Sequence, residues 1–304
     1  MNFKVCALVG PTASGKSAAA LELAKKVSGE IVNADSRQIY KYIPIGSTQP
    51  DAAAFKAAPH HLYGFLDPKE SYNAEEYSKT ARKIILEILA RGKSAIVVGG
   101  TGFYVQALFD GLSPLPQSDK NTRAQLQKLL EEKGRQFLHD ALAQVDPISA
   151  KTIPYQNSQR ALRALEVYRI SGKPISQWRQ ESKGEKFSVE PKFLGLSWNR
   201  EELRERIRER TKKILTGILE ESRWLKSHGY TLRDPGLSGL GYKHCFQFLE
   251  KNITKEKLFD LIYLDTVHYA KRQMTWFKKD PRINWLRAES LRNSIENLFT
   301  FNLK

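Results

Sequence analysis

The chain is poor in cysteine and contains no long apolar run. Its 304 residues include two cysteines, Cys6 in an apolar stretch and Cys245 far along the chain. Two such thiols make neither a disulfide framework nor a metal site, which excludes the small disulfide-stapled secreted scaffolds. No stretch approaches the roughly 18 apolar residues of a membrane span, and no signal-peptide pattern opens the chain. We therefore expect a cytoplasmic protein that does not enter a membrane.

Acidic residues are scarce relative to basic ones. The 33 Asp and Glu stand against 49 Lys and Arg, which gives a formal net charge of +16, and residues 191–304 alone carry 23 cations against 14 acids. Such an excess is typical of a protein with a polyanionic partner, although a basic surface kept for solubility explains it equally well. Hydrophobic residues make up 41% of the chain, so we expect a sizeable core and no disorder.

One eight-residue stretch has the sequence of a phosphate-binding loop. It follows an apolar run, precedes a helix-forming run, and consists of Gly10, Pro11, Thr12, Ala13, Ser14, Gly15, Lys16 and Ser17. Gly10 and Gly15 allow backbone conformations in which successive N–H groups turn onto an anion. Lys16 supplies a charge for terminal phosphate oxygens, and the Ser17 hydroxyl suits a Mg²⁺ ion shared with them. The sequence predicts a diphosphate or triphosphate site and does not specify which phosphate ester it holds.

Strand-like and helix-like patterns alternate around this loop. Apolar runs at residues 3–9, 30–34 and 94–98 are separated by helical periodicity. The alternation predicts an α/β fold, a parallel sheet flanked by helices, with ligands beyond the carboxyl ends of the strands. The second run leads to Asp35, which suits either a Mg²⁺ ligand or a general base, and the third leads to a Gly-rich turn at Thr101.

A helical segment interrupts the alternating pattern. Residues 112–190 open with Ser-Pro-Leu-Pro and then lack strand-like runs, so we expect an all-helical insertion domain between core segments 1–111 and 191–304. Within it, Arg160 and Arg163 share one side of a helix, which is as consistent with a solvated face as with an anion site.

A long helix is expected from residue 200 to residue 227, and one of its arginines falls on the inward apolar stripe. This residue is Arg210. Because an unpaired buried charge is costly, its guanidinium should meet either a carboxylate or a ligand phosphate.

Cations stand beside aromatic rings in two later stretches. Tyr242 and Lys243 belong to a Gly-rich turn, and residues 271–279 interleave cations with Trp276 and Phe277. Such a pattern fits nucleic acid, where cations meet phosphates and rings stack on bases. Phe277 also continues a core stripe, so part of the pattern is packing.

Seven sequence blocks together resemble the tRNA dimethylallyltransferase family, also called tRNA isopentenyltransferases or IPP transferases. The blocks are GPTASGKS from Gly10, DSRQIY from Asp35, VVGGTGFY from Val97, NSQRALRALEV from Asn157, ISGKP from Ile170, GLGYKH from Gly239 and KRQMTWF from Lys271. They follow the family's order over nearly the whole chain. The resemblance implies a P-loop-type core whose helical insertion embraces the anticodon stem-loop of tRNA.

The resemblance also implies a reaction. A dimethylallyl group passes from dimethylallyl diphosphate to the exocyclic N6 amine of adenosine at tRNA position 37, just 3′ of the anticodon, in the presence of Mg²⁺. Asp35 is then implied as the general base that takes the amine proton. Thr12 and Arg210 are implied at the leaving diphosphate, together with the rest of the loop from Gly10 to Ser17. We expect the chain to act as a monomer.

A larger set of residues is implied at the tRNA. It comprises Asp35, Ser36, Arg37, Gln38, Thr101, Arg123, Gln159, Arg160, Ala161, Leu162, Arg163, Gly239, Gly241, Tyr242, Lys243, Lys271, Arg272, Gln273, Trp276 and Lys278. Thr101 is implied near the reacting base. The adenine has to leave its stack to reach an enclosed site, and Phe103, Tyr104 and Tyr242 are candidates to receive it, with core packing expected for at least one of them.

One position departs from the family. Arg-Gln usually follows the Tyr of the Gly-rich turn, and here the pair is Lys243-His244. Lysine keeps the charge but lacks the bidentate fork, which puts a base-specific role in doubt. Three other functions remain open: a P-loop kinase of a nucleotide or small metabolite, an adenylate isopentenyltransferase that uses AMP or ADP, and an RNA-binding module without enzymatic activity.

Overall fold

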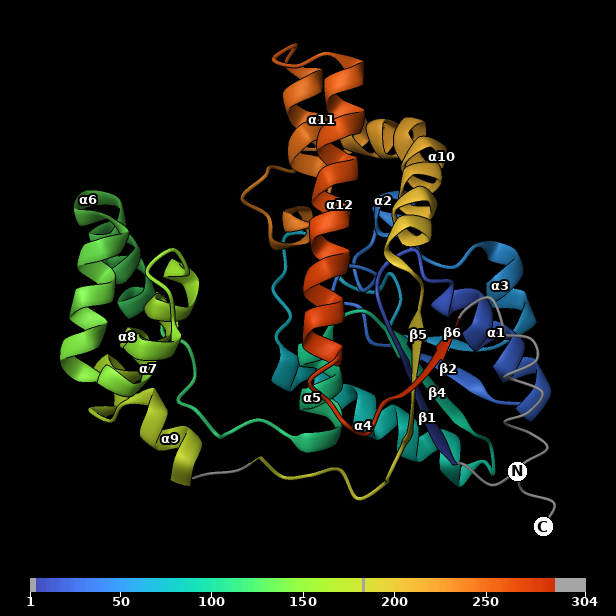
Figure 1. Ribbon diagram of the computed structural model, residues 1–304, viewed down its shortest axis with the longest axis horizontal. Coiled ribbons are helices and arrows are strands. Elements are labelled where there is room, and N and C mark those ends of the chain that lie inside the picture. Colours follow the sequence, from blue (N-terminus) through green and yellow to red (C-terminus); the bar gives the residue numbers. More distant parts are fainter. Residues whose placement is uncertain (1–3, 182–183, 288–304) are drawn as a thin grey trace. The chain divides into compact units, whose positions relative to one another are not determined.

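The computed structural model describes residues 4–181 and 184–287. Two compact units make up the chain: Met1–Phe109 with Phe187–Lys304, here the core unit, and Asp110–Lys186, here the helical unit (Figure 1). These boundaries lie two and four residues from the expected ones at 111/112 and 190/191. The portions of the expected core and insertion at residues 1–3, 182–183 and 288–304 lie outside the described residues.

A single parallel sheet carries the core unit. Among the described residues its six strands are β1 (Val5–Val9), β2 (Glu30–Asn33), β3 (His60–His61), β4 (Ala95–Gly99), β5 (Lys192–Ser197) and β6 (Asn284–Arg287). Their order is β3-β2-β4-β1-β5-β6, and every pair is parallel. The carboxyl ends of β1, β2 and β4 therefore meet at one edge of the sheet, as the alternating pattern predicted. The short outer strands β3 and β6 were not predicted.

Helices of the core unit follow the strands in sequence. They are α1 (Lys16–Val27), α2 (Pro44–Ser47), α3 (Ala52–Ala57), α4 (Ala74–Ala90), α5 (Gly102–Asp110), α10 (Arg200–Ser227), α11 (Tyr242–Leu249) and α12 (Lys255–Phe277), with a 3₁₀ turn η1 at Pro235–Ser238. Local signals fix several starts. Asn73 and Glu76 form a reciprocal capping box at α4, while Asn199 and Thr254 accept backbone N–H groups at the starts of α10 and α12.

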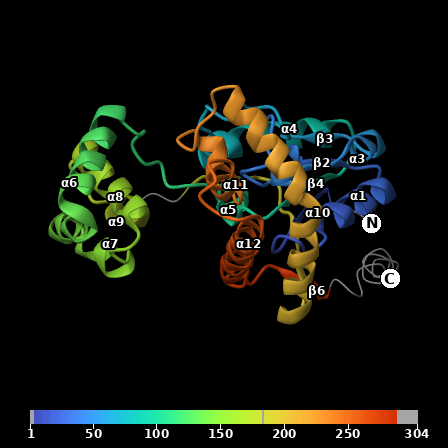
Figure 2. The ribbon, with the colours of Figure 1, turned by 90° about the horizontal axis from the view of Figure 1, so that it is seen from above.

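Opposite faces of the sheet are covered by α1 and α4. Ala20 and Leu23 of α1 pack against Cys6 and Leu8 of β1 in one buried cluster. Figures 1 and 2 both show α4 on the other side of the strands. Every residue of β1, β2 and β4 is buried, which explains why these strands read as continuous apolar runs rather than as alternating patterns.

Beyond the carboxyl edge of the sheet, α10, α11 and α12 build a second apolar cluster. It includes Ile218 of α10, Tyr242 and Phe246 of α11 and Ile262 of α12. The long helices α10 and α12 lie side by side in both ribbon views (Figures 1 and 2). They stand where ligands of parallel sheets bind.

The helical unit has its own core. It consists of α6 (Lys120–Val145), α7 (Pro147–Thr152), α8 (Ser158–Ser171) and α9 (Ile175–Glu181), and its described residues include no strand. Gly134 takes φ 82°, ψ 177° and breaks α6 into two helical parts. The apolar faces of α6 and α8 meet at buried Leu138, Leu142 and Leu162.

Both cysteines are buried and unpaired in the core unit, Cys6 in β1 and Cys245 in α11. Burial raises the pKa of the Cys6 thiol to about 12 and that of the Cys245 thiol to about 11, so both stay protonated near neutral pH. No helix within residues 4–181 and 184–287 combines the length and the apolar character that crossing a bilayer requires.

Candidate active site

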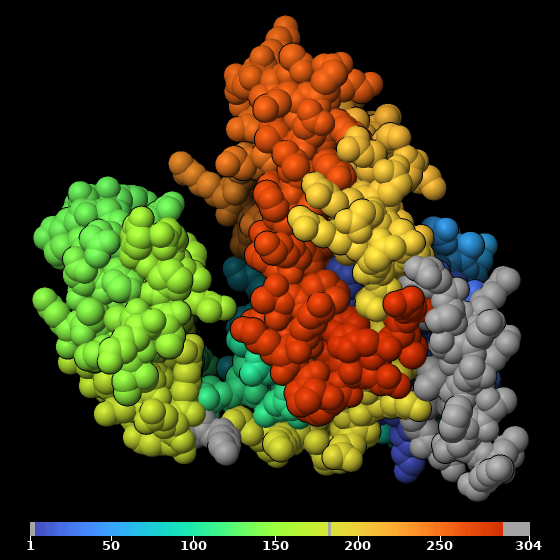
Figure 3. Space-filling view, viewed as in Figure 1, coloured from blue at the N-terminus to red at the C-terminus, as the bar shows by residue number. Residues whose placement is uncertain are grey.

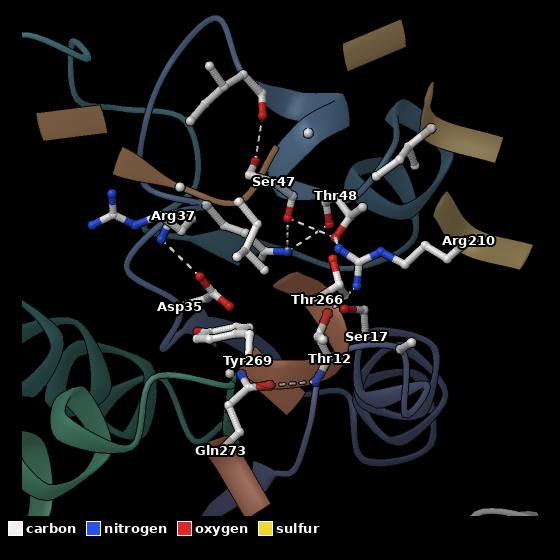
Figure 4. A pocket seen from close by; sticks show the side chains of 18 of the residues that line it. Thr12, Ser17, Asp35, Arg37, Ser47, Thr48, Arg210, Thr266, Tyr269 and Gln273 are labelled. Atoms are coloured by element: carbon white, nitrogen blue, oxygen red, sulfur yellow. Dashed lines mark hydrogen bonds between the residues drawn. The ribbon is translucent and has the colours of Figure 1, made fainter. Parts of the chain in front are cut away.

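A cavity of about 490 Å³ lies at the carboxyl edge of the sheet in the core unit. The phosphate loop, the segment after β2, and α2, α10 and α12 all contribute to its wall. Figure 4 shows side chains from these elements pointing into it, among them Thr12, Asp35, Arg210 and Tyr269. Segments distant in sequence therefore converge where the first strand meets its loop.

The phosphate loop adopts the conformation that its glycines allow. Gly10 has φ 144° and Gly15 has φ 93°, and a Cβ on Gly10 would lie 2.7 Å from the carbonyl oxygen of Leu196. Helix α1 then begins at Lys16 with no side-chain cap, so its first N–H groups and the positive end of its dipole are available to an anion. The Lys16 ammonium donates to the carbonyl of Pro11 at 2.6 Å.

Part of this loop faces away from the cavity. Thr12, Ala13, Gly15, Lys16 and Ser17 line the wall. The Ser14 hydroxyl is buried and has no hydrogen-bond partner among the described residues, and Gly10 and Pro11 are also buried. The Ser14 side chain is not part of the cavity wall. Gly10, Pro11 and Ser14 form the side of the loop that faces the protein interior.

Arg210 reaches the loop from α10. One terminal nitrogen donates to the hydroxyl of Thr12, and the other donates to the hydroxyl of Thr48 at 3.0 Å. No carboxylate of the described residues lies within 4.0 Å of this guanidinium. Of the two partners expected from the sequence, the protein carboxylate is thus not found there. The guanidinium faces the cavity with neutral partners only, an arrangement suited to an incoming anion.

Burial opposes the charged form of both cations at the loop. It lowers the pKa of Arg210, against the opposing field of Asp35. It lowers the pKa of Lys16 to about 8, a shift that Asp35 reduces and Arg210 deepens. Two cations therefore face one acid, and a bound polyanion would relieve the imbalance.

Asp35 lies at the end of β2 with its orientation fixed. Its backbone N–H donates to the buried Asn33 side chain at 2.8 Å, and its Oδ1 accepts the N–H of Arg37 at 2.9 Å. Within the described part of the chain no donor bonds Oδ2. One carboxylate oxygen thus holds the turn while the other can act on a ligand, which is the geometry that a general base needs.

Thr101 is held beside Asp35 by neighbours on two elements. Its hydroxyl oxygen accepts the N–H of Ser36 at 3.0 Å and its hydroxyl donates to that of Ser36 at 3.3 Å, and the Tyr269 side chain on α12 lies nearby. Burial raises the pKa of Tyr269, so it stays neutral. Sequence analysis missed Tyr269, although it lies four residues before Gln273, on the same side of α12.

Gln273 of α12 bridges two loops beside the cavity. Its carboxamide oxygen accepts the N–H of Thr12 at 2.7 Å, and its nitrogen donates to the carbonyl of Gly100 at 2.9 Å. The side chain is 5% exposed. The amide therefore ties the phosphate loop to the turn after β4, and Gln273 also lines the cavity.

Other residues assigned to tRNA in the core unit divide into two groups. The side chains of Gln38 and Tyr242 are 9% and 1% exposed, and they hydrogen-bond the carbonyls of α2 and the carboxylate of Glu221, respectively. Arg37 donates to the carbonyl of Pro235 and the hydroxyl of Ser238. Gly239 is half-buried and Gly241 is buried. Exposed side chains are those of Lys243, Lys271, Arg272, Trp276 and Lys278.

The aromatic candidates separate in the same way. Tyr104 is 4% exposed and stacks on Tyr77 with ring centroids 4.1 Å apart, so packing accounts for it. Phe103 is 48% exposed and meets Trp276 edge to face. Buried Tyr242 is a packing residue as well.

In the helical unit, a buried carboxylate organises the assigned arginines. Glu166 is fully buried, with Arg163 at 2.8 Å and Arg123 at 3.5 Å. Arg123 also donates to Gln159 at 2.8 Å, whereas Arg160 is exposed. The Arg160 and Arg163 side chains therefore have different environments despite their shared helical side.

Two neighbours in α8 pack inward. The side chains of Ala161 and Leu162 are 1% and 0% exposed in the core of the helical unit. Both side chains are covered by protein and pack in this core.

A resident metal would have few protein ligands. No group of three His, Cys, Asp or Glu side chains suited to a metal ion occurs among the described residues. Ser17 lines the cavity beside the loop. Its hydroxyl fits an ion whose other ligands are oxygens of a bound phosphate ester and water, which is how Mg²⁺ is commonly held.

Comparisons with known proteins agree with this geometry. The family model described as IPP transferase matches residues 38–280, and the model described as Isopentenyl transferase matches residues 3–64. The chain is 39% identical to a tRNA dimethylallyltransferase of Geobacter sulfurreducens over 97% of this chain and 95% of that protein. It is 40% identical to a tRNA dimethylallyltransferase of Carboxydothermus hydrogenoformans over 99% and 97%.

Solved structures resemble it over their length. A full-length tRNA isopentenylpyrophosphate transferase from Bacillus halodurans superimposes with a TM-score of 0.71 at 30% identity, covering 98% of this chain and 96% of that one. A eukaryotic dimethylallyltransferase, described as acting on tRNA, gives 0.80 at 27% identity, covering 99% and 80%. The two family models together, the curated relatives and the solved structures all match nearly the whole chain, including its phosphate loop and parallel sheet. This chain therefore belongs to the IPP transferase family of tRNA dimethylallyltransferases.

Proposed function

We propose that this enzyme transfers a dimethylallyl group from dimethylallyl diphosphate to the N6 amine of adenosine 37 in tRNA. The products are N6-isopentenyladenosine in the tRNA and diphosphate. The observation that carries the proposal is the position of Arg210 and the phosphate loop on one side of a cavity that Asp35 also lines. An anion site and a carboxylate base in one cavity suit displacement of a diphosphate by an amine.

The diphosphate occupies the loop end of the cavity in this proposal. Backbone N–H groups at the start of α1, the Lys16 ammonium and the Arg210 guanidinium surround that end. Breaking the carbon–oxygen bond concentrates negative charge on the departing diphosphate, and donors already aimed at it stabilise that charge. Removal of one such donor commonly costs on the order of 10²- to 10³-fold in rate.

The acceptor amine is deprotonated by Asp35. The amine nitrogen bonds the allylic carbon, the carbon–oxygen bond breaks with its electron pair going to the diphosphate, and the proton passes from the amine to Oδ2 of Asp35. Arg37 and Asn33 hold the carboxylate in place through the backbone contacts at Oδ1 and at the Asp35 N–H. Thr101, held by hydrogen bonds to Ser36, is proposed to contact the same nucleotide.

Mg²⁺ is the proposed cofactor, with the Ser17 hydroxyl as its protein ligand. When bound with the diphosphate, such an ion neutralises charge on the phosphate oxygens. Asp35 is proposed as the base rather than as a metal ligand, with Oδ1 holding the turn and Oδ2 facing the acceptor amine.

Surfaces for tRNA are proposed separately on each unit. On the core unit, α12 forms a long strip of the surface seen in Figure 3, and its exposed Lys271, Arg272, Trp276 and Lys278 combine cations with a ring. On the helical unit, Arg160 and Arg123 present cations from α8 and α6. Cations meet the phosphate backbone, and rings stack on unpaired bases. The helical unit is proposed to embrace the anticodon stem-loop, and the enzyme is proposed to act as a cytoplasmic monomer.

Mass spectrometry of the RNA tests the function. The purified protein is incubated with Mg²⁺, dimethylallyl diphosphate and unmodified tRNA that carries adenosine at position 37. The RNA is then digested, and the masses of its nucleosides are measured. We expect one added dimethylallyl group at adenosine 37. Phosphoryl transfer from ATP without prenyl transfer would instead indicate a P-loop kinase.

The acceptor is decided in the same assay. Free AMP or ADP replaces tRNA in a parallel reaction at equal concentration. Equal or better prenylation of the free nucleotide would establish the adenylate isopentenyltransferase alternative. An Asp35→Asn variant that binds tRNA but shows no product separates catalysis from RNA binding alone.

A further inference from the structure

Thr48 has an unusual backbone conformation beside the active site. It follows α2 with φ 55° and ψ 52°, in the left-handed region. For a β-branched residue this conformation is a true outlier, because the branched side chain crowds the following carbonyl. Strain of this kind persists only where surrounding contacts hold it, and it concentrates at functional sites.

The surrounding contacts do hold it. Gln38 donates to the carbonyl of Ser47 at 3.1 Å and to that of Thr48 at 2.7 Å. At the other end of α2, the carboxylate of Glu221 accepts the N–H groups of Ile45 at 2.5 Å and Gly46 at 2.8 Å. The four-residue helix is thereby clamped between the segment after β2 and helix α10.

The result of this clamp is the direction of one hydroxyl. Thr48 uses its hydroxyl hydrogen on the carbonyl of Ser47 at 2.7 Å, which leaves the oxygen lone pairs for Arg210. The second terminal nitrogen of Arg210 donates to that oxygen at 3.0 Å, while the first donates to Thr12. Two hydroxyls from opposite walls therefore hold a guanidinium that no described carboxylate pairs.

We propose that Thr48 is a positioning residue that holds the Arg210 guanidinium toward the diphosphate. The identity of the anion rests on the proposed function. A neutral hydroxyl fixes the direction of the guanidinium and leaves its charge for the ligand, which a carboxylate at this position would neutralise. The left-handed backbone is what turns the hydroxyl toward α10.

The test compares Thr48→Val with Thr48→Asn, using inorganic diphosphate with Mg²⁺ as the probe and calorimetry to measure Kd. Valine keeps the branched shape and the strain but cannot accept a hydrogen bond. We expect its Kd to rise about tenfold, as for loss of a hydrogen bond to a charged group. Asparagine tolerates the left-handed region and carries an oxygen, so its loss should be clearly smaller than that of valine.

Two glycine variants separate positioning from stability. Thr48→Gly relieves the strain and removes the hydroxyl. We therefore expect its Tm to equal or exceed that of the native protein, while its Kd for diphosphate rises as in Thr48→Val. Lys251→Gly is the matched control, because Lys251 is an exposed non-glycine residue with φ 61° away from the cavity. It should relieve strain and leave Kd unchanged. Losses of affinity that simply follow losses of Tm would overturn the proposal.

A double-mutant cycle tests whether Thr48 affects diphosphate binding through Arg210. If Thr48 acts through Arg210, Thr48→Val added to Arg210→Gln should cost little more than Arg210→Gln alone. Additive losses, or a Kd for Thr48→Val within about twofold of the native value, would contradict the positioning role.

Failure of the proposed function gives a different pattern. A native chain that binds diphosphate but does not prenylate tRNA would refute the function while the Thr48 comparison proceeds unchanged. A native chain that prenylates tRNA and a Thr48→Val variant with native affinity would refute only the positioning role. A native chain that does not bind diphosphate would overturn both.

Discussion

The carboxamide of Gln273 joins the phosphate loop to the Gly-rich turn after β4. Its oxygen accepts the backbone N–H of Thr12 at 2.7 Å, and its nitrogen donates to the carbonyl of Gly100 at 2.9 Å. A Cβ on Gly100 would lie 2.1 Å from that nitrogen, so only glycine permits the approach. Helix α12, which carries exposed cations on its outer side, is thus tied by its inner side to two loops of the active site.

Gln273→Glu should impair substrate binding. A carboxylate still accepts from Thr12, but it cannot donate to Gly100, and it places a negative charge near the diphosphate. We expect KM for dimethylallyl diphosphate to rise about tenfold or more, in line with the loss of a buried hydrogen bond and the added repulsion. Steady-state kinetics measure it, and Thr275→Ala, an exposed change on the same helix, should leave KM unaltered. A native KM for Gln273→Glu would contradict a role in substrate binding for the Gln273 bridge between Thr12 and Gly100.

Asp35→Asn should reduce kcat rather than substrate binding. The amide matches the carboxylate in shape and can keep the contact to Arg37, but it cannot take a proton. General base catalysis contributes about 10²- to 10⁴-fold, and we expect a loss in that range. Single-turnover rates, measured with enzyme in excess over tRNA and saturating dimethylallyl diphosphate, give the chemical step, and filter binding gives the tRNA affinity. Retention of most of the activity would remove Asp35 as the base.

Diphosphate affinity should depend on pH through Lys16. Burial lowers the pKa of this ammonium to about 8, so the free enzyme loses the charge as pH rises past that value. We expect the Kd for diphosphate to rise from pH 7 to pH 9 in the native protein. In the Lys16→Arg variant, the part of this rise that comes from the loss of the Lys16 charge should disappear. Arginine stays charged over the range, and titration of diphosphate itself affects both proteins equally. Parallel pH profiles for the two proteins would refute this role.

Lys16 also predicts how folding stability changes with pH. Its folded pKa lies below its unfolded value, so the unfolded chain binds more protons between the two. The contribution of Lys16 therefore raises the free energy of unfolding as pH increases through this window. Urea unfolding of the native chain and of Lys16→Met at pH 7.5 and pH 9.5 isolates this contribution. Between the two pH values, the free energy of unfolding of the native chain should rise relative to that of Lys16→Met.

The affinity for tRNA should fall with salt, and α12 should contribute to the slope. Lys271 and Arg272 are exposed neighbours on this helix. Removing one cation that binds a phosphate reduces the slope of log K against log salt by about 0.7 to 0.9, so alanine at both should flatten it by up to roughly two such increments. Fluorescence anisotropy between about 50 and 200 mM salt measures the slope. Alanine at Lys56 and Lys83, exposed elsewhere on the core unit, is the matched control and should leave the slope unchanged.

Glu221→Ala should destabilise the core unit. Three donors meet this buried carboxylate: the N–H groups of Ile45 and Gly46 and the hydroxyl of Tyr242. Alanine leaves them unsatisfied, and we expect a loss of about 2–4 kcal/mol in the free energy of unfolding. Urea unfolding tests it against Glu220→Ala, whose side chain is exposed on the same helix and should change stability little. Equal effects for the two would rule out the clamp.

Much of the fold was predictable because its signals are local. The expected helix from residue 200 to residue 227 is observed as Arg200–Ser227, and the three apolar runs became β1, β2 and β4. The outer strands were missed for a physical reason. His60–His61 is only two residues long, and Asn284–Arg287 mixes polar and apolar side chains, so neither produces a period that marks a strand.

Positions within the site were harder to predict. Arg210 was placed on an inward stripe from helical period alone, and the structure brings it to Thr12. Its second partner, Thr48, follows a four-residue helix and matches no catalytic motif. Gln38 and Gln273 belong to blocks associated with RNA, but the structure turns both amides inward, because buried backbone groups needed partners there.

The sequence by itself determined the phosphate loop, since its glycines, lysine and hydroxyl are consecutive and a short peptide segment dictates their geometry. Only the tertiary structure decided what faces that loop. Gln273 lies 261 residues from Thr12 and Arg210 lies 198 residues from it, yet both bond it. No periodicity or motif spacing in the sequence predicts contacts between residues this far apart in the chain. They depend on which polar groups the packing of helices against the sheet leaves buried and in need of a partner.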